Sequence, residues 1–248
     1  MTTGRRRGFL VLGGLLLAIA GGCAVLTATV TTSQGLNFEV STHRLPLYLK
    51  ALQFIDRSMQ YQQIADEIAG NAVSDTDRVL KVFEWTQRQI KNTPDGWPIV
   101  DDHILHIIIR GHGLNDQKAD VFATLASYAG VPAFWSFMRV ESPRARTILS
   151  FARIDGRWRV FDIENAVVFR TDDGELATLD DLRGHPERVP ASARSIVIDG
   201  VPYEEIVTTA SMPPIPNPLR VELQMPSLRL WHELKRVLRI ESDGESGR

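Results

Sequence analysis

Apolar residues in the first part of the body recur at the spacing of a helix. Between residues 45 and 68 they fall three or four positions apart at most places, and Gly70 follows the last of them. This period puts them on one side of a helix, so we expect helical structure over 45–68, as two short helices that end at Gly70. The stripe consists of Leu49, Leu52, Ile55, Met59, Ile64 and Ile68.

Two further helices have sharper boundaries. Ser74 followed by Asp77 has the pattern of an N-cap with a carboxylate in the first helical turn, and Pro94 interrupts the stripe that comes next. A second helix is predicted over 116–129, with Gly130 as its C-terminal stop. The first stripe contains Val79, Val82, Phe83 and Ile90, and the second contains Ala119, Phe122, Ala123 and Ala126.

Beyond Gly130 the pattern changes from helical to strand-like. Strands are predicted over 133–140, 147–154 and 157–163, and the last two flank Asp-Gly, a strong two-residue hairpin turn. A shorter strand is predicted over 195–198. Helices followed by antiparallel strands predict an α+β fold in which N-terminal helices pack on an antiparallel sheet.

The N-terminus has the pattern of a membrane-targeting segment. Arginines at 5–7 precede an apolar run over 9–30 that contains no charged residue. Ended at Ala20, the run is a signal segment followed by Gly-Gly-Cys, which resembles a bacterial lipoprotein site with Cys23 as the lipidation candidate. Extended to Val30, it reaches the roughly 20 residues that span a bilayer. A buried core helix is the remaining alternative, whereas either membrane reading predicts a tethered body facing the periplasm or another extracytoplasmic space.

Composition limits the partners and the number of domains. The chain has 248 residues, of which 44% are hydrophobic, and its net charge of -2 provides no basic field for nucleic acid. Its single cysteine can form no intrachain disulfide. The expected organisation is an anchor over 1–30, a linker over 31–42, one domain over 43–212, a proline-rich strap with an amphipathic helix over 213–240, and a polar tail over 241–248.

The middle of the chain resembles a known superfamily. Residues 113–133 contain a Lys-Ala pair and end in Gly-Val-Pro-Ala, and residues 148–162 contain the Asp-Gly turn, Trp158 and Asp162. In this order and spacing they resemble the core of the transglutaminase-like superfamily, a papain-type cysteine-protease fold. The resemblance covers roughly residues 76–165.

The resemblance implies a catalytic triad whose positions can be located in this chain. Members of the family have a Cys at the start of the central helix, a His on the first strand of the hairpin and an Asp at the end of the next strand. These positions correspond to Asn115, Thr147 and Asp162. An amide is no nucleophile, and a threonine hydroxyl without a base is a poor one, so the resemblance implies a degenerate member that lacks the catalytic Cys and His.

Local geometry supports this alignment of the two strands. If Asp-Gly is a two-residue turn, Ile154 pairs with Arg157, and Thr147 and Asp162 become diagonal neighbours on one face, about 7 to 8 Å apart. Asn115 has an alternative explanation, because asparagine is among the preferred N-cap residues of a helix.

Other constellations could carry chemistry without a thiol. His103 and His106 lie one helical turn apart, which makes them weak candidates for a metal site, and no cofactor is expected. Asp162 and Glu164 share a strand face and could divide acid and base roles. Four tryptophans could line a binding cleft or belong to the core: Trp85, Trp97, Trp135 and Trp158.

Three functions therefore remain open. The first is a non-catalytic binding or scaffolding module of the bacterial cell envelope, with a peptide, glycan or protein as its partner. The second is a hydrolase that uses Asp and His residues near 101–120, or the Asp162 and Glu164 pair. The third is a structural subunit of an envelope assembly that contacts partners through the terminal helix, unless that helix docks on the body or lies on a membrane.

Overall fold

The computed structural model describes residues 21–22, 26–101, 103–139 and 146–237. The chain divides into two compact units, one formed by residues 1–56 with 100–102 and the other by residues 57–99 with 103–248. Most of the expected anchor, including Cys23, lies outside the described residues. None of the helices in the described ranges combines the length and apolar character needed to cross a bilayer.

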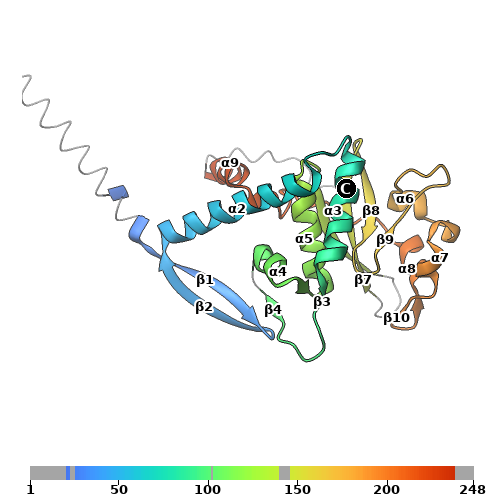
Figure 1. The fold of residues 1–248 in the computed structure, drawn as a ribbon, viewed down its shortest axis with the longest axis horizontal. Helices are drawn as coiled ribbons and strands as arrows, with labels where there is room; N and C mark the ends of the chain where they lie inside the picture. The colour runs from blue at the N-terminus through green and yellow to red at the C-terminus, as the bar shows by residue number, and fades with distance from the viewer. Residues whose placement is uncertain (1–20, 23–25, 102, 140–145, 238–248) are drawn as a thin grey trace, which may run out of the picture. The chain divides into compact units, whose positions relative to one another are not determined.

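The first unit contains a β-hairpin where a linker was expected. β1 (Thr29–Leu36) and β2 (Glu39–Pro46) are antiparallel, and β4 (Val100–Asp101) pairs with the end of β1 (Figure 1). The linker prediction for 31–42 is therefore wrong, and the longer anchor reading runs into a strand. Runs of Thr and Val favour strands, and Asn37 and Phe38 close the turn with positive φ angles of 49° and 68°.

The helices of the second unit follow the predicted pattern with one change. α2 (Leu47–Ala69), which begins in the first unit, is a single helix of 23 residues and not two short ones. No Gly or Pro interrupts it, which explains its continuity. α3 (Asp75–Gln89) has the predicted cap, because the Ser74 hydroxyl accepts a hydrogen bond from the Asp77 amide at 3.1 Å.

The central helix and the main sheet agree closely with the predicted elements. α5 (Asn115–Tyr128) is followed by a four-stranded antiparallel sheet in which the strands keep their chain order. The predicted turn is confirmed, because Ile154 pairs with Arg157. The strands are β6 (Ala133–Arg139), β7 (Arg146–Ile154), β8 (Arg157–Asp162) and β9 (Val167–Val168).

The sheet is buried on both faces, which explains why β7 and β8 contain few exposed positions. One face packs with α2, α3 and α5 around Ala152, Ile154 and Phe161. The opposite face packs with the helices between residues 179 and 209, around Phe151 and Val160. The mixed helices and antiparallel strands confirm the predicted α+β class.

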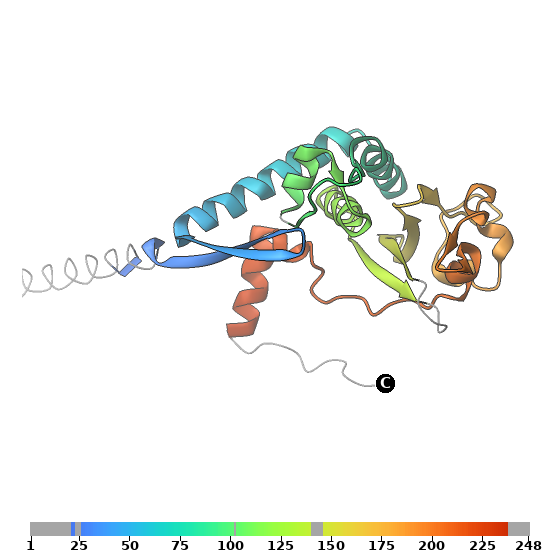
Figure 2. The ribbon, with the colours of Figure 1, turned by 90° about the horizontal axis from the view of Figure 1, so that it is seen from below.

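Short elements complete the second unit. Before α5 come α4 (Ile104–Arg110) and a parallel pair formed by β3 (Lys91–Asn92) and β5 (His112–Gly113). Figure 2 shows residues 210–221 running as an irregular segment from α8 (Tyr203–Thr209) toward α9 (Pro226–Val237). The remaining elements are α6 (Leu179–Leu182), η1 (Pro186–Arg188), α7 (Ala191–Arg194), β10 (Val197–Ile198), β11 (Val201–Pro202) and η2 (Glu222–Gln224).

Candidate functional site

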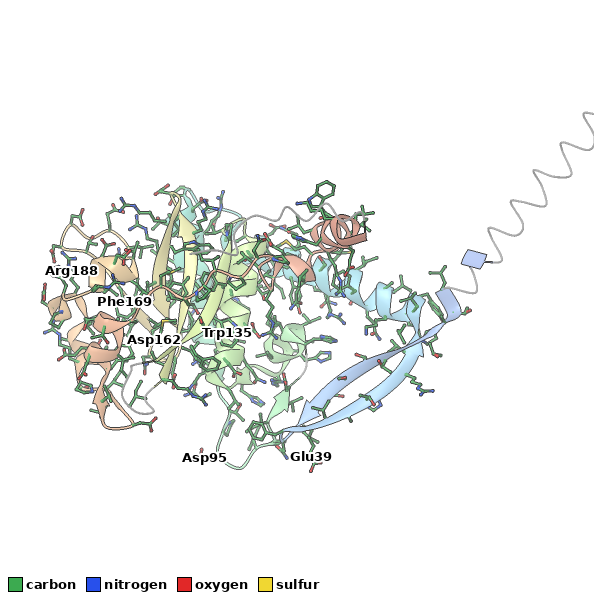
Figure 3. All side chains as sticks on the ribbon, turned by 180° about the vertical axis from the view of Figure 1, so that it is seen from behind. Glu39, Asp95, Trp135, Asp162, Phe169 and Arg188 are labelled. Carbon is green, nitrogen blue, oxygen red and sulfur yellow. The ribbon has the colours of Figure 1, made fainter. Side chains whose placement is uncertain are left out.

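Asp162, the one triad position that retains the family residue, is covered completely. Its side chain has no exposed surface, and Figure 3 shows it inside the body. One carboxylate oxygen accepts a hydrogen bond from the backbone N–H of Asn165. The other accepts hydrogen bonds from the side-chain amide of Asn165 and from the Tyr203 hydroxyl. Burial raises the pKa of Asp162, and these hydrogen bonds offset part of the rise.

Tyr203 contributes this contact from α8, outside the part of the chain that resembles the superfamily. Burial raises the pKa of its phenol, and the neighbouring Asp162 carboxylate raises it further. The phenol therefore keeps its proton and donates a hydrogen bond to the carboxylate. No feature of the sequence pairs residues 203 and 162, because the contact depends on the packing of α8 against the sheet.

Asn115 is the first residue of α5 and not its N-cap, so the N-cap prediction is wrong. Leu114 occupies the cap position with extended backbone angles, and its amide donates to Gln117 Oε1 at 3.1 Å. The Gln117 side chain, from the first turn of the helix, thus accepts a hydrogen bond at the N-terminus of α5, and Asn115 does not serve as the cap. The Asn115 side chain instead acts on Glu164, which follows β8, by lowering the pKa of its carboxyl.

Lys118 connects α5 to β3. It is 4% exposed, and its ammonium donates to Asn92 Oδ1 at 3.0 Å. Burial lowers the pKa of Lys118, whereas the Glu164 and Asp162 carboxylates act in the opposite direction. Burial and then Asp162 raise the pKa of Glu164, and Lys118 and Asn115 offset part of that rise. We call Asn92, Asn115, Lys118, Asp162 and Glu164 the polar cluster.

Thr147 lies where the predicted register puts it, on β7. The pairing of Ser150 with Phe161, extended by one pair to the end of β8, puts Leu149 opposite Asp162 and Thr147 diagonal to Asp162, whereas Glu164 lies in the turn that follows β8. The side chain is 2% exposed, and its hydroxyl has no hydrogen-bond partner in the described part of the chain. The register therefore brings Thr147 beside the cluster, but no described contact joins it to Asn115 or Asp162.

The histidines form a neighbouring region with different geometry. His103 precedes α4 and His106 lies in its first turn, with ring centroids 5.9 Å apart, as the helical spacing predicts. His112 lies three residues before Asn115, with its ring edge against Trp97 and Nδ1 3.4 Å from the Thr93 hydroxyl. Within the described ranges, no three His, Cys, Asp or Glu side chains are grouped as metal ligands.

The tryptophans do not line one cleft. Trp85 and Trp135 pack against the core on the α5 side of the sheet, and Trp158 packs against the core on the other side. Trp135 also donates to Asp120 Oδ1 at 2.6 Å. Trp97 is the exposed one of the four. Three of them thus pack, partly buried, against the core on opposite sides of the sheet.

Comparison with known proteins gives matches only among solved structures. No family model and no curated protein matches the chain. A crystal structure of a proposed cysteine protease from Cytophaga hutchinsonii is 18% identical, over 44% of this chain and 38% of the other, with a TM-score of 0.38. A proposed protease from Parabacteroides distasonis is 12% identical over 42% and 23%, with a TM-score of 0.36.

A third solved structure, named only as a TGase, is 12% identical over 72% of this chain and 51% of the other, with a TM-score of 0.35. The chain therefore spans between 23% and 51% of the length of these three structures. Their names are consistent with the transglutaminase-like resemblance of the sequence.

Proposed function

We propose that the protein is a membrane-tethered, non-catalytic transglutaminase-like domain that acts as a binding or scaffolding module in the cell envelope. The observation that carries the proposal is the enclosure of Asp162, whose side chain has no exposed surface and accepts hydrogen bonds from Asn165 and Tyr203. At the position where the family has its nucleophile, this chain has the Asn115 amide, which is no nucleophile.

The chemistry of the other two positions supports the same conclusion. Thr147 supplies a hydroxyl with no base among the described residues, and the Asp162 carboxylate is enclosed by Asn165 and Tyr203. A carboxylate in that position orients an imidazole in a working triad, and here it is engaged by other donors. Because Asp162 has no exposed surface, it also fails to pair with Glu164 as an acid and base on one substrate.

The tether and the compartment rest on the N-terminal sequence. Arginines at 5–7 before an uncharged apolar run favour export with retention at the membrane. A partner in that compartment would be an envelope peptide, glycan or protein. A folded domain without catalytic groups would act by binding such a partner.

Enzyme assays on the full chain in detergent test the proposal. We expect no hydrolysis or acyl transfer with peptide and glutamine amide donors, and no change on treatment with a thiol alkylator. Thiol-dependent acyl transfer in the Asn115→Cys, Thr147→His double variant, absent from an Asn115→Ala, Thr147→Ala control, would support the register. Turnover by the wild type that disappears in Glu164→Gln or His106→Ala would overturn the proposal in favour of a hydrolase.

A further inference from the structure

The terminal helix α9 turns its apolar side outward. Leu230, Trp231 and Leu234 are 62%, 55% and 44% exposed. Their spacing puts them on one side of the helix. The expectation that this side docks on the body is therefore wrong for the described part of α9.

The start of α9 is nevertheless fixed to the second unit. Val221, in the turn before η2, is buried in the core, and Met225 packs against the same core. His232 lies on the side of α9 opposite Leu230 and Leu234, and its Nε2 is 3.8 Å from Glu222 Oε2 in η2. The segment before α9 is thus held by the core, and His232 on the polar side of α9 lies near η2, while Leu230, Trp231 and Leu234 stay exposed.

Basic residues accompany the outward face. The Lys235 ammonium lies 5.1 Å from the centre of the Trp231 ring. Residues 226–240 contain four basic residues, Arg229, Lys235, Arg236 and Arg239, and one acidic residue, Glu233. This gives a local charge of +3, four minus one, in a chain whose net charge is -2. The stretch of sequence that contains the exposed apolar side is thus basic.

We propose that α9 lies on the surface of an anionic lipid bilayer, with Leu230, Trp231 and Leu234 in the headgroup region. An exposed apolar side that carries a tryptophan beside a lysine, within a basic segment, has the chemistry of interfacial helices. The lysine stem can lie along the apolar surface while its ammonium reaches the headgroups. The proposal does not depend on whether the polar cluster binds or catalyses.

Tryptophan quenching by brominated lipids tests the proposal on the full chain. Wild type and Trp231→Phe are reconstituted from detergent into vesicles of phosphatidylcholine alone or with 30% phosphatidylglycerol, and the fluorescence difference between them isolates Trp231. We expect this difference to be quenched in anionic vesicles, and at least threefold less in zwitterionic vesicles or in 0.5 M salt.

Charge reversal provides the matched comparison. Arg229→Glu with Lys235→Glu should reduce quenching of Trp231 at least threefold, whereas Arg183→Glu, on an exposed side chain away from α9, should leave it unchanged. Circular dichroism confirms that each variant is folded. The proposal would be overturned if quenching of Trp231 were the same in anionic and zwitterionic vesicles. It would also be overturned if Trp231 were protected from lipid because two copies associate through α9.

Discussion

The Tyr203 hydroxyl donates a hydrogen bond to the Asp162 carboxylate across 41 positions of sequence. Both side chains are buried completely, so neither can exchange this partner for water. The bond joins α8 to the end of β8, and it occupies the carboxylate that the family resemblance assigns to a triad. Removal of either group should therefore affect stability and not catalysis.

Replacement of Tyr203 by Phe should destabilise the protein by about 1.5 to 3 kcal/mol, the range for a hydrogen bond to a charged group. The Tyr203 bond lowers the pKa of Asp162, so its loss raises that pKa further. Because the folded-state pKa then lies still higher above the unfolded value of 3.8, the destabilisation should grow as the pH rises from 4 to 7. Urea unfolding at both pH values measures it.

Tyr128→Phe is the matched control for this experiment. The Tyr128 hydroxyl donates to the neutral Ser58 hydroxyl at 2.9 Å, and it also lies 3.1 Å from the neutral Gln224 carbonyl oxygen. We expect a smaller loss in this variant, about 1 kcal/mol, that does not change between pH 4 and pH 7. Equal pH dependence in the two variants would contradict the role assigned to Asp162.

Replacement of Glu164 by Gln should stabilise the folded protein relative to the wild type, and this stabilisation should grow as the pH rises. The pKa of Glu164 is raised in the folded state, so its contribution to stability is greatest below the unfolded value of 4.5 and is lost as the pH rises through the folded value. Gln removes that loss and keeps an acceptor for Asn115. Unfolding free energies of both proteins from pH 4 to pH 7 should diverge in favour of the variant.

Lys118 supplies the comparison for that series. Its charge lowers the pKa of Glu164, so Lys118→Met should raise that pKa further and make the pH-dependent loss larger than in the wild type. A Lys118→Met protein with the wild-type pH profile would show that the ammonium and the carboxylate do not interact.

Replacement of Gly156 by Ala should cost about 1 to 2 kcal/mol, the penalty for a side chain in the left-handed region. Gly156 has a φ of 76°, and an added Cβ would meet no atom within 4 Å, so the backbone angle alone carries the cost. Asp155→Asn, at a φ of 51°, should stay within about 0.5 kcal/mol because asparagine tolerates this region. Thermal unfolding of both variants checks the difference.

Replacement of Trp135 by Phe should remove the bond to Asp120 and cost about 1.5 to 3 kcal/mol. Arg220 also contacts Asp120, at 3.1 Å, but its side chain is largely exposed. Arg220→Gln should therefore cost less than about 1 kcal/mol and lose that effect in high salt. Equal losses from the two variants would contradict the larger contribution assigned to the Trp135 hydrogen bond.

Local patterns predicted the elements that local chemistry determines. The Ser74 cap and the two-residue turn at Asp155 and Gly156 depend on neighbours in sequence, and the structure confirms both. That turn also fixes the register, so it located Thr147 and Asp162 correctly relative to each other. The hairpin at 29–46 was missed because its turn, Asn37 and Phe38, contains no glycine, and because the apolar N-terminal run extended into its first strand.

The polar cluster was only partly predictable, since most of it depends on tertiary packing. Asp162 and Asn115 were identified from the resemblance, whereas the prediction that Asp162 and Glu164 share a strand face is wrong, because β8 ends at Asp162 and Glu164 lies in the turn that follows. Lys118 was seen only as part of a family motif, although it becomes the buried cation of the site. Asn92 in β3 accepts a hydrogen bond from Lys118, and Tyr203 in α8 donates one to Asp162. No local sequence pattern predicts that β3 and α8 contribute to the site.

The enclosure of Asp162 has a consequence for dissecting the protein. The resemblance to the superfamily ends near residue 165, yet the phenol that satisfies the carboxylate comes from residue 203. A fragment that stops at the family boundary would keep both strands of the hairpin and leave a desolvated carboxyl lacking one of its donors. The smallest fragment that folds on its own should therefore extend through α8, beyond residue 165, where the resemblance to the superfamily ends.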